Sequence, residues 1–142
     1  MAVGYTAVVD VDGEGRNGGR VRPSDGLLDT GLAIPEELGG AGTATNPEQL
    51  LAAGWAACFL GALRRAAGER GIRLTSTTVT AEIRLTHGDD DEFSLSAVLR
   101  PVLGGVDQAT AEEPARAAHG ICPYSKATRG TLPVVIRAGV AA

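Results

Sequence analysis

The segment Thr45-Asn46-Pro47-Glu48-Gln49-Leu50-Leu51-Ala52-Ala53-Gly54-Trp55-Ala56-Ala57-Cys58-Phe59-Leu60-Gly61-Ala62-Leu63 decides the fold, because it predicts one long buried helix with a thiol at its middle. Asn46 can cap the first turn, and Pro47 suits the first helical position, where no amide partner is lost. After Glu48 there is no charged residue until Arg64, and apolar side chains cover nearly the whole circumference of the helix. Such a helix belongs in the centre of a fold or in an interface.

Two glycines inside this helix indicate close packing. Gly54 and Gly61 each lower helix propensity by about 1 kcal/mol relative to alanine. We therefore expect another part of the protein to approach the helix closely at these positions. The helix is expected to end near Arg70–Gly71, where arginine side chains favour the negative end of the helix dipole.

Length and composition bound the class of protein. The 142 residues fit a single domain, 1–142, with 44% hydrophobic and 21% charged residues. A net charge of −4 argues against a nucleic-acid partner, which would require a basic surface. There is no signal-peptide pattern, and the most apolar window, 50–63, is too short to span a bilayer. We expect a cytoplasmic protein that does not associate with membranes.

The remaining patterns predict an α+β chain. The first third reads as an antiparallel meander, and the Pro/Gly-rich loop 35–45 reads as a flexible connector and not as a phosphate-binding loop. The predicted order is βββ-α-ββ-α-(short α)-β, with strands at 5–11, 20–22, 27–34, 74–86, 93–102 and 132–138 and with later helices at 106–119 and 122–128.

The second helix carries conflicting signals. Thr110-Ala111-Glu112-Glu113 fits a capping box, but Pro114 follows too late to sit comfortably in the first turn. Gly120 is expected to stop this helix. Cys122 then reads as the cap of a short helix with Pro123 at its first position.

Cys58 and Cys122 lie 64 residues apart in the sequence. A reducing cytosol disfavours a permanent disulfide, and neither His87 nor His119 shows metal-ligand spacing with a thiol. The pair is therefore either two inert core thiols or a redox pair. Apolar surroundings would raise the pKa of Cys58, whereas the free amides of the short helix would favour the thiolate of Cys122.

Two long motifs resemble a known family. Residues 42–59, together with Cys122-Pro123-Tyr124-Ser125-Lys126-Ala127-Thr128-Arg129-Gly130, resemble the organic hydroperoxide resistance (Ohr) branch of the OsmC/Ohr family. The Tyr-Thr-Ala start, Gly18-Gly19-Arg20 and the final Val-Val-Ile strand extend the match nearly end to end. The resemblance implies an OsmC-like fold: an intertwined homodimer with antiparallel sheets wrapped around two long central helices.

The resemblance also implies a peroxiredoxin-like thiol peroxidase that reduces alkyl and fatty-acid hydroperoxides to alcohols. Cys58 would attack the peroxide and become a sulfenic acid, and Cys122 would condense with it to form a disulfide. Dihydrolipoamide on a lipoylated protein would then reduce the disulfide as an external reductant. Neither a bound cofactor nor a metal is implied.

The family further implies an activating arginine. Arg20 is expected to donate to the Cys58 thiolate and to the peroxide, held in place by the carboxylate of Glu48. Trp55, Phe59 and Tyr124 are the expected substrate-binding side chains. Glu48 and Cys58 lie about 15 Å apart along one helix, so either the arginine spans part of this gap or a second copy of the helix supplies the carboxylate. We therefore expect an obligate homodimer with shared active sites.

Several alternatives stay open. An OsmC-like peroxidase with a broader substrate range fits the same motifs, as does a non-catalytic dimer that binds a hydrophobic ligand or senses oxidation. His119 either assists the disulfide or faces solvent at a helix end. The chain departs from the family pattern at Ala44, Trp55 and Pro114, and Trp55 is the departure that could reshape the peroxide pocket.

Overall fold

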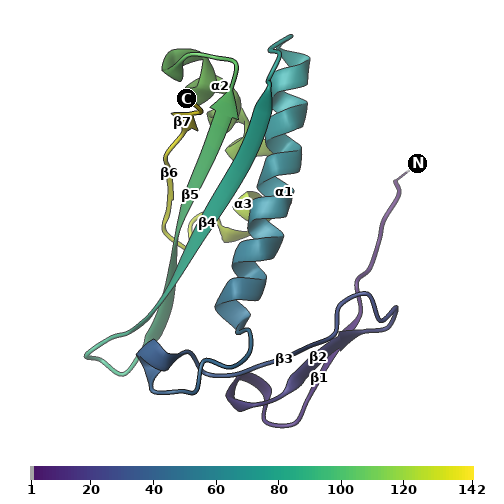
Figure 1. Ribbon diagram of the computed structural model, residues 1–142, viewed down its shortest axis with the longest axis vertical. Helices are drawn as coiled ribbons and strands as arrows, with labels where there is room; N and C mark the ends of the chain where they lie inside the picture. The colour runs from purple at the N-terminus through teal and green to yellow at the C-terminus, as the bar shows by residue number, and fades with distance from the viewer. Residues whose placement is uncertain (1) are drawn as a thin grey trace. The chain divides into compact units, whose positions relative to one another are not determined.

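The computed structural model describes residues 2–142, which fall into two compact units divided between Leu50 and Leu51. Figure 1 shows the elements in the predicted order with one additional strand at the end. The single-domain assignment stays a prediction. The elements are β1 (Val9–Asp12), β2 (Arg20–Pro23), β3 (Thr30–Gly31), α1 (Pro47–Glu69), β4 (Ser76–His87), β5 (Phe93–Gly104), α2 (Gln108–Ile121), α3 (Pro123–Thr128), β6 (Val134–Ile136) and β7 (Gly139–Val140), with short 3-10 turns at Gly15–Asn17 and Glu36–Leu38.

The first unit contains the predicted antiparallel meander, in which β2 pairs with both β1 and β3. The strands are shorter than expected, because β1 begins at Val9 and β3 has only two residues. All four residues of β1 are exposed, whereas Val21 of β2 is buried. This unit alone therefore gives β1 no apolar layer to pack against.

The start of α1 follows the sequence signals. The Asn46 side-chain oxygen accepts a hydrogen bond from the Gln49 amide at 2.9 Å, and Pro47 takes the first helical position. The helix ends at Glu69, and Gly71 adopts a left-handed conformation with φ of 66°. Glycine adopts this conformation without a steric penalty, which explains the termination of the helix there.

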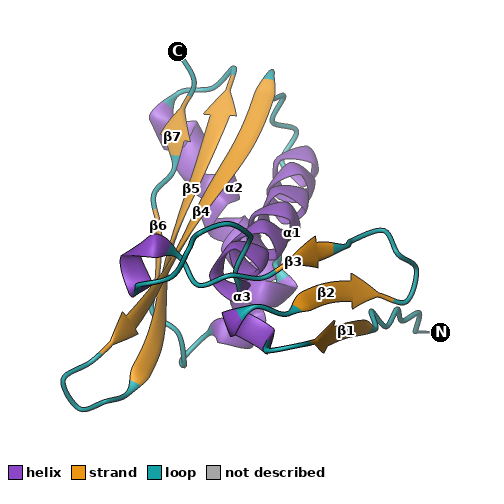
Figure 2. Cartoon of the chain, turned by 60° about the horizontal axis from the view of Figure 1, so that its bottom comes forward, coloured by secondary structure: helices purple, strands orange, loops and turns teal. Residues whose placement is uncertain are grey.

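The second unit is built on a long hairpin. β4 and β5 pair antiparallel from Ser76↔Gly104 to His87↔Phe93. β6 and β7 both run parallel to β5, so this sheet is mixed, where only antiparallel pairing was expected. The chain reaches β6 through α2 and α3, and such a helical crossover allows the parallel direction (Figure 2).

The core of this unit lies between the sheet and the helices. β5 is buried on its inward row, whereas the inward row of β4 is only half-buried. The opposite face of β4 is exposed and mostly polar. The buried cluster comprises Trp55, Phe59, Ala62 and Leu63 of α1, Ala97, Leu99 and Leu103 of β5, Ala111, Ala115 and Ala118 of α2, and Cys122.

Helix α1 buries only one of its faces in this chain. Trp55, Phe59 and Leu63 are fully buried, whereas Ala53 and Ala57 on the opposite face are exposed. The helix is long and apolar enough to cross a membrane by length and composition, a test that core helices of soluble proteins also pass. Its buried side chains belong to the same hydrophobic cluster as residues of β5 and α2.

Helix α2 differs from its prediction at both ends. Asp107 is the N-cap, and its carboxylate accepts from the Thr110 amide at 2.8 Å, so the predicted capping box at Thr110 is wrong. The helix also continues through Gly120 to Ile121, because the glycine lies on an exposed face where nothing opposes helical continuation. Pro114 lies inside the helix and is fully buried.

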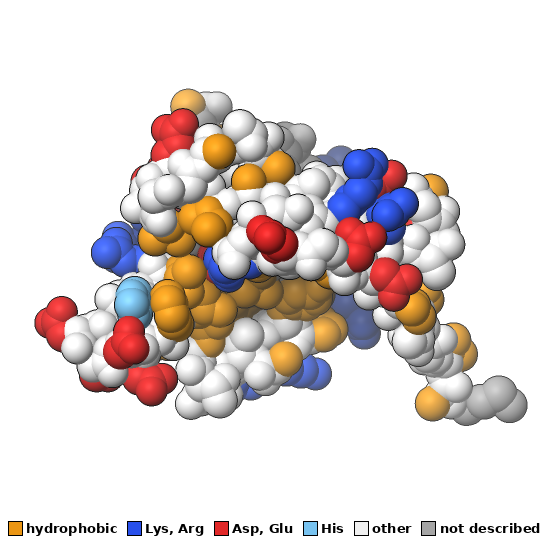
Figure 3. Space-filling view, turned by 90° about the horizontal axis from the view of Figure 1, so that it is seen from below, with side chains coloured by type: hydrophobic (Ala, Val, Ile, Leu, Met, Phe, Trp, Pro, Cys, Tyr) orange, Lys and Arg blue, Asp and Glu red, His pale blue; other side chains and the backbone are white. Residues whose placement is uncertain are grey.

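Many apolar side chains remain at the surface of the chain. Val9 and Val11 of β1, Leu27 and Phe93 are each roughly half or more exposed. Hydrophobic side chains are visible among the surface atoms in a space-filling view (Figure 3). Large exposed apolar side chains mark interaction sites in soluble proteins where they form a contiguous patch.

Candidate active site

The two cysteines, distant in sequence, lie in direct contact in the structure. The Cys122 thiol donates to Cys58 across an Sγ–Sγ distance of 3.4 Å, and both cysteines are free. Cys58 lies in the middle of α1 and is partly exposed, whereas Cys122 caps α3 and is fully buried. The packing of α3 against α1 therefore brings the two sulfurs together.

The pKa of the Cys58 thiol is raised above its ordinary value, chiefly by burial. A hydrogen bond from the backbone amide of Tyr124 lowers this pKa, whereas the side-chain interaction and the charge coupling with the Cys122 thiol raise it further. From the sequence, the free amides of this helical turn are expected to favour the thiolate of Cys122. The structure brings one of them to Cys58 instead, where it favours a thiolate.

The close approach predicted at Gly54 is present. A Cβ at this position would lie 2.9 Å from Oη of Tyr124 and 3.3 Å from two of its ring carbons. The absence of a side chain therefore makes room for the tyrosine of α3. No atom lies within 4 Å of a Cβ built at Gly61, so the chain alone does not explain that second glycine.

A buried hydrogen bond joins the same two helices beside the thiols. The Trp55 indole Nε1 donates to Oγ of Ser125 at 3.2 Å, and both side chains have no exposed surface. Sequence reasoning did not select Ser125, although it lies inside the family motif that begins at Cys122. The only hydrogen-bond donor of the Trp55 side chain thus points into the protein.

The other predicted substrate-binding residues lie near the same helices. Phe59 follows Cys58 on α1 and is fully buried, whereas Tyr124 on α3 is 40% exposed. Contact of Trp55, Phe59 and Tyr124 with a substrate stays a prediction.

In the first unit, Glu48 pairs with Arg16. The Arg16 guanidinium donates to both carboxylate oxygens of Glu48, with Nη1 at 3.1 Å from Oε2. The hydrogen bond from Arg16 holds the pKa of Glu48 below its ordinary value, although partial burial acts in the opposite direction. Arg16 lies in the glycine-rich turn between β1 and β2 and is not among the predicted site residues.

The predicted pairing of Arg20 with Glu48 is wrong. Arg20 Nε donates to Oδ1 of Asp29 at 2.6 Å in an exposed ion pair. The reason is strand geometry, because successive side chains alternate between the two faces of a strand. Val21 takes the buried face of β2, which leaves Arg20 on the exposed face with Asp29.

His119 does not face solvent freely at the end of α2. Its Nδ1 atom is buried and has no hydrogen-bond partner within residues 2–142. Burial lowers its pKa, and the nearby charge of Arg129 lowers it further. Arg129 also donates to the backbone carbonyl of His119 at 3.0 Å.

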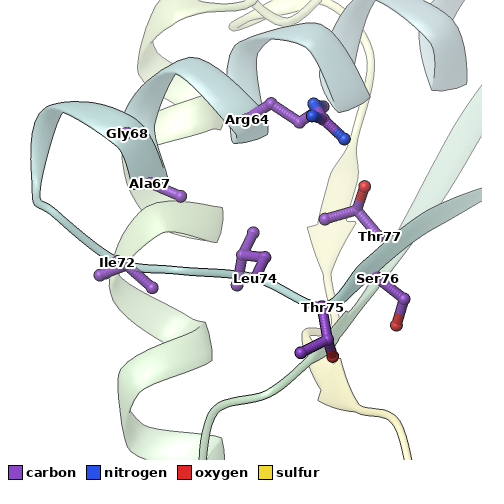
Figure 4. Close-up of a pocket in the computed structure, with 8 residues that line it drawn as sticks. All are labelled: Arg64, Ala67, Gly68, Ile72, Leu74, Thr75, Ser76 and Thr77. Atoms are coloured by element: carbon purple, nitrogen blue, oxygen red, sulfur yellow. The ribbon is translucent and has the colours of Figure 1, made fainter.

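Two cavities lie elsewhere in the second unit. One, of about 290 Å³, is lined by His119 with residues of α2 and of the segment 136–138. The other, of about 160 Å³, lies between the end of α1 and the start of β4, with the Arg64 side chain extending toward Thr77 (Figure 4). Neither cavity is lined by a cysteine. Among residues 2–142 there is also no group of three or more side chains suited to hold a metal ion.

Comparison with known proteins identifies the family. The sequence model of the family described as OsmC-like protein matches residues 40–137. The chain belongs to the OsmC/Ohr family. It is 42% identical over 134 residues to the organic hydroperoxide resistance protein of Xanthomonas axonopodis pv. citri, which covers 93% of this chain and 92% of the relative.

Solved structures agree with this assignment. The chain superposes with a TM-score of 0.90 and 42% identity on an organic hydroperoxide resistance protein OsmC from Legionella pneumophila, covering 98% of this chain and 100% of the other. OhrB of Bacillus subtilis gives a TM-score of 0.84 at 39% identity, covering 94% and 98%. The α+β, OsmC-like fold expected from the sequence is thereby confirmed.

Proposed function

We propose that this protein is a cysteine-based peroxidase that reduces organic hydroperoxides to alcohols. The observation that carries the proposal is the 3.4 Å contact between Cys58 and Cys122 on two packed helices. The relatives named for organic hydroperoxide resistance support the same substrate class.

In the first step, the Cys58 thiolate attacks one oxygen of the hydroperoxide. The O–O bond breaks, the sulfur gains oxygen to become a sulfenic acid, and the leaving alkoxide takes a proton to become the alcohol. Apolar neighbours such as Phe59 favour alkyl and fatty-acid peroxides, because hydrogen peroxide offers no apolar part to bind.

In the second step, the Cys122 sulfur attacks the sulfur of the sulfenic acid. A disulfide forms and the hydroxyl leaves as water, with the proton supplied by the Cys122 thiol. A disulfide bond is about 2.0 Å long, so the two sulfurs need only a short approach from their separation of 3.4 Å. This step protects Cys58 from further oxidation.

A dithiol then restores both cysteines by two exchange reactions, in which it is itself oxidised to a disulfide. We propose dihydrolipoamide on a lipoylated protein as this external reductant, and no bound cofactor. Cys122 is fully buried and Cys58 is partly exposed, so the dithiol is expected to attack the sulfur of Cys58.

The reaction needs a cation that stabilises the Cys58 thiolate, because burial raises the pKa of this thiol. We propose that Arg16 supplies it, in place of Arg20. A guanidinium has five N–H donors, and two nitrogens of Arg16 suffice to hold Glu48. Arg20 is instead committed to Asp29 at the surface.

We further propose that the active form is a cytoplasmic homodimer. The exposed face of α1, the half-buried inward row of β4 and the exposed strand β1 all leave apolar surface that a second copy would cover. Shared active sites would follow from an intertwined arrangement of two such chains.

Steady-state turnover tests the proposal. The protein should consume tert-butyl hydroperoxide or a fatty-acid hydroperoxide in the presence of dihydrolipoamide, and Cys58→Ser should abolish turnover. Comparable turnover of hydrogen peroxide would favour a broader OsmC-like peroxidase. Binding of an apolar ligand without turnover would instead favour the non-catalytic alternative.

A further inference from the structure

The reach of Cys122 depends on how helix α3 is attached. This helix has only six residues, and Cys122 is its N-cap without any side-chain capping bond. A helix this short has little intrinsic stability and takes its position from its neighbours. Cys122 is also the C-cap of α2, where its amide donates to the Ala118 carbonyl at 2.8 Å. The contacts between α3 and α1 therefore act together with this attachment in setting where the Cys122 sulfur lies.

Besides the contacts that Cys58 makes with Cys122 and with the Tyr124 amide, two side-chain contacts join α3 to α1 within one turn of the thiols. The Tyr124 ring covers Gly54, and the Trp55 indole donates to Ser125. The contact between Tyr124 and Gly54 is a packing contact, so it does not depend strongly on direction. The second is directional, and it is fully buried at both ends.

We propose that Trp55 and Ser125 are positioning residues, whose hydrogen bond holds the first turn of α3 against α1 so that Cys122 reaches an oxidised Cys58 before a second peroxide does. This inference rests on the proposed peroxidase function. Trp55 precedes Cys58 by one helical turn, and Ser125 follows Cys122 by one helical turn. The bond therefore joins the two helices one turn away from the two sulfurs.

Because the hydrogen bond between Trp55 and Ser125 is buried, its loss is energetically costly. If either partner is removed, the other is left as an unpaired polar group in a fully buried site, which is unfavourable. A displacement of the helices relieves this, and α3 is the shorter of the two. Movement of α3 carries both the Cys122 sulfur and the Tyr124 amide away from Cys58.

The consequence appears in the fate of the sulfenic acid. At Cys58 it either condenses with Cys122, releasing water, or takes a second oxygen from another hydroperoxide to become a sulfinic acid, releasing a second alcohol. Reaction geometry controls the first route, since small misplacements of reacting atoms slow a reaction strongly. Peroxide concentration controls the second route.

The test compares Ser125→Ala and Trp55→Phe with the unaltered full-length protein. Reduced protein is treated with increasing tert-butyl hydroperoxide, and the ratio of sulfinic acid to disulfide is read by intact-mass spectrometry after the free thiols are blocked. We expect this ratio to rise in both variants by about tenfold, on the scale of what misplaced reacting atoms cost. The double variant should resemble the single ones, because both partners act through one bond.

Thr128→Val is the matched control. Thr128 is also on α3, but its hydroxyl bonds only to the carbonyls of Tyr124 and Ser125 in the same helix. The ratio of sulfinic acid to disulfide in Thr128→Val should match that of the unaltered protein. The ratio is measured only on Cys58 that has already been oxidised, so it is independent of the rate of the first step.

The outcomes separate this inference from the proposed function. If Cys58 is not oxidised by hydroperoxide in the unaltered protein, the proposed function fails. If Cys58 is oxidised to the disulfide and the Ser125→Ala and Trp55→Phe ratios stay at the control value, the positioning role is wrong. A rise of equal size in Thr128→Val would also overturn it, because general loosening of α3 would then explain the effect.

Discussion

At the scale of single residues, the chemistry of the candidate site depends on two thiols in contact and on the few polar groups around them. Cys58 and Cys122 stood out as a pair in motifs, and the structure brings them together. Ser125 and Arg16 were missed, because a serine next to a helix start and an arginine in a glycine-rich turn both look like ordinary surface chemistry. Only three-dimensional packing reveals that Ser125 is buried against Trp55.

The arginine assignment gives a first prediction. Arg16→Ala should raise the pKa of the Cys58 thiol in the assembled protein, by on the order of one to three units if the guanidinium lies next to the sulfur. Arg20→Ala is the matched control, since it removes an equal charge from an exposed pair with Asp29. The rate of thiol alkylation as a function of pH measures both. A shift only in Arg20→Ala would return the role to Arg20, and an equal shift in the two variants would show that neither arginine acts specifically on the thiol.

His119 gives a second prediction, about stability and pH. Burial lowers the pKa of His119 in the fold, so as the pH falls below about 6.5 the unfolded chain takes up the proton first. The free energy of unfolding should therefore decrease from pH 6.5 down to the folded-state pKa and show no contribution from His119 above that range. His119→Gln should flatten this part of the curve of urea midpoint against pH, and an unchanged curve would contradict this role of His119.

At the scale of elements, local chemistry decided most of what could be predicted. Asn46 and Pro47 marked the start of α1, and alternation marked the β4–β5 hairpin. The predictions were wrong where a contact with a distant part of the chain, or a second possible N-cap residue, determines the structure. Asp107 displaced the expected cap of α2, and β6 runs parallel to β5 because the intervening helices carry the chain back across the sheet. No single short sequence motif indicates either the cap at Asp107 or the parallel direction of β6.

Gly54 tests the packing of α3 on α1. Gly54→Ala should lower the free energy of unfolding by about 1–3 kcal/mol, because the added Cβ would lie 2.9 Å from Tyr124 Oη and force the two helices apart. At Gly68 on the same helix no atom lies within 4 Å, so Gly68→Ala should gain up to about 1 kcal/mol of helix propensity. Urea denaturation measures both. A neutral Gly54→Ala would mean that the tyrosine moves aside freely.

At the scale of the whole molecule, the chain is small and acidic, yet it leaves much apolar surface uncovered. It has a net charge of −4, and its central helix was expected to be buried nearly all round. Within one chain, that helix buries Trp55, Phe59 and Leu63 but exposes Ala53 and Ala57. Composition and periodicity thus predicted how much apolar surface the helix carries. They could not say how much of it one chain covers, because that depends on the assembly.

A homodimer that covers this face predicts the effect of a charge placed on it. Ala57 is exposed in the chain, so Ala57→Arg should leave a single chain able to fold, with its guanidinium in water. In a dimer packed through α1, the same arginine would be buried without a partner, which strongly disfavours assembly. Sedimentation should then show a monomer, and hydroperoxide turnover should fall with it, because the shared sites are lost. Ala109→Arg, on an exposed position of α2, should leave both the sedimentation and the turnover unchanged. A fully active monomer in either case would show that one chain carries a complete site.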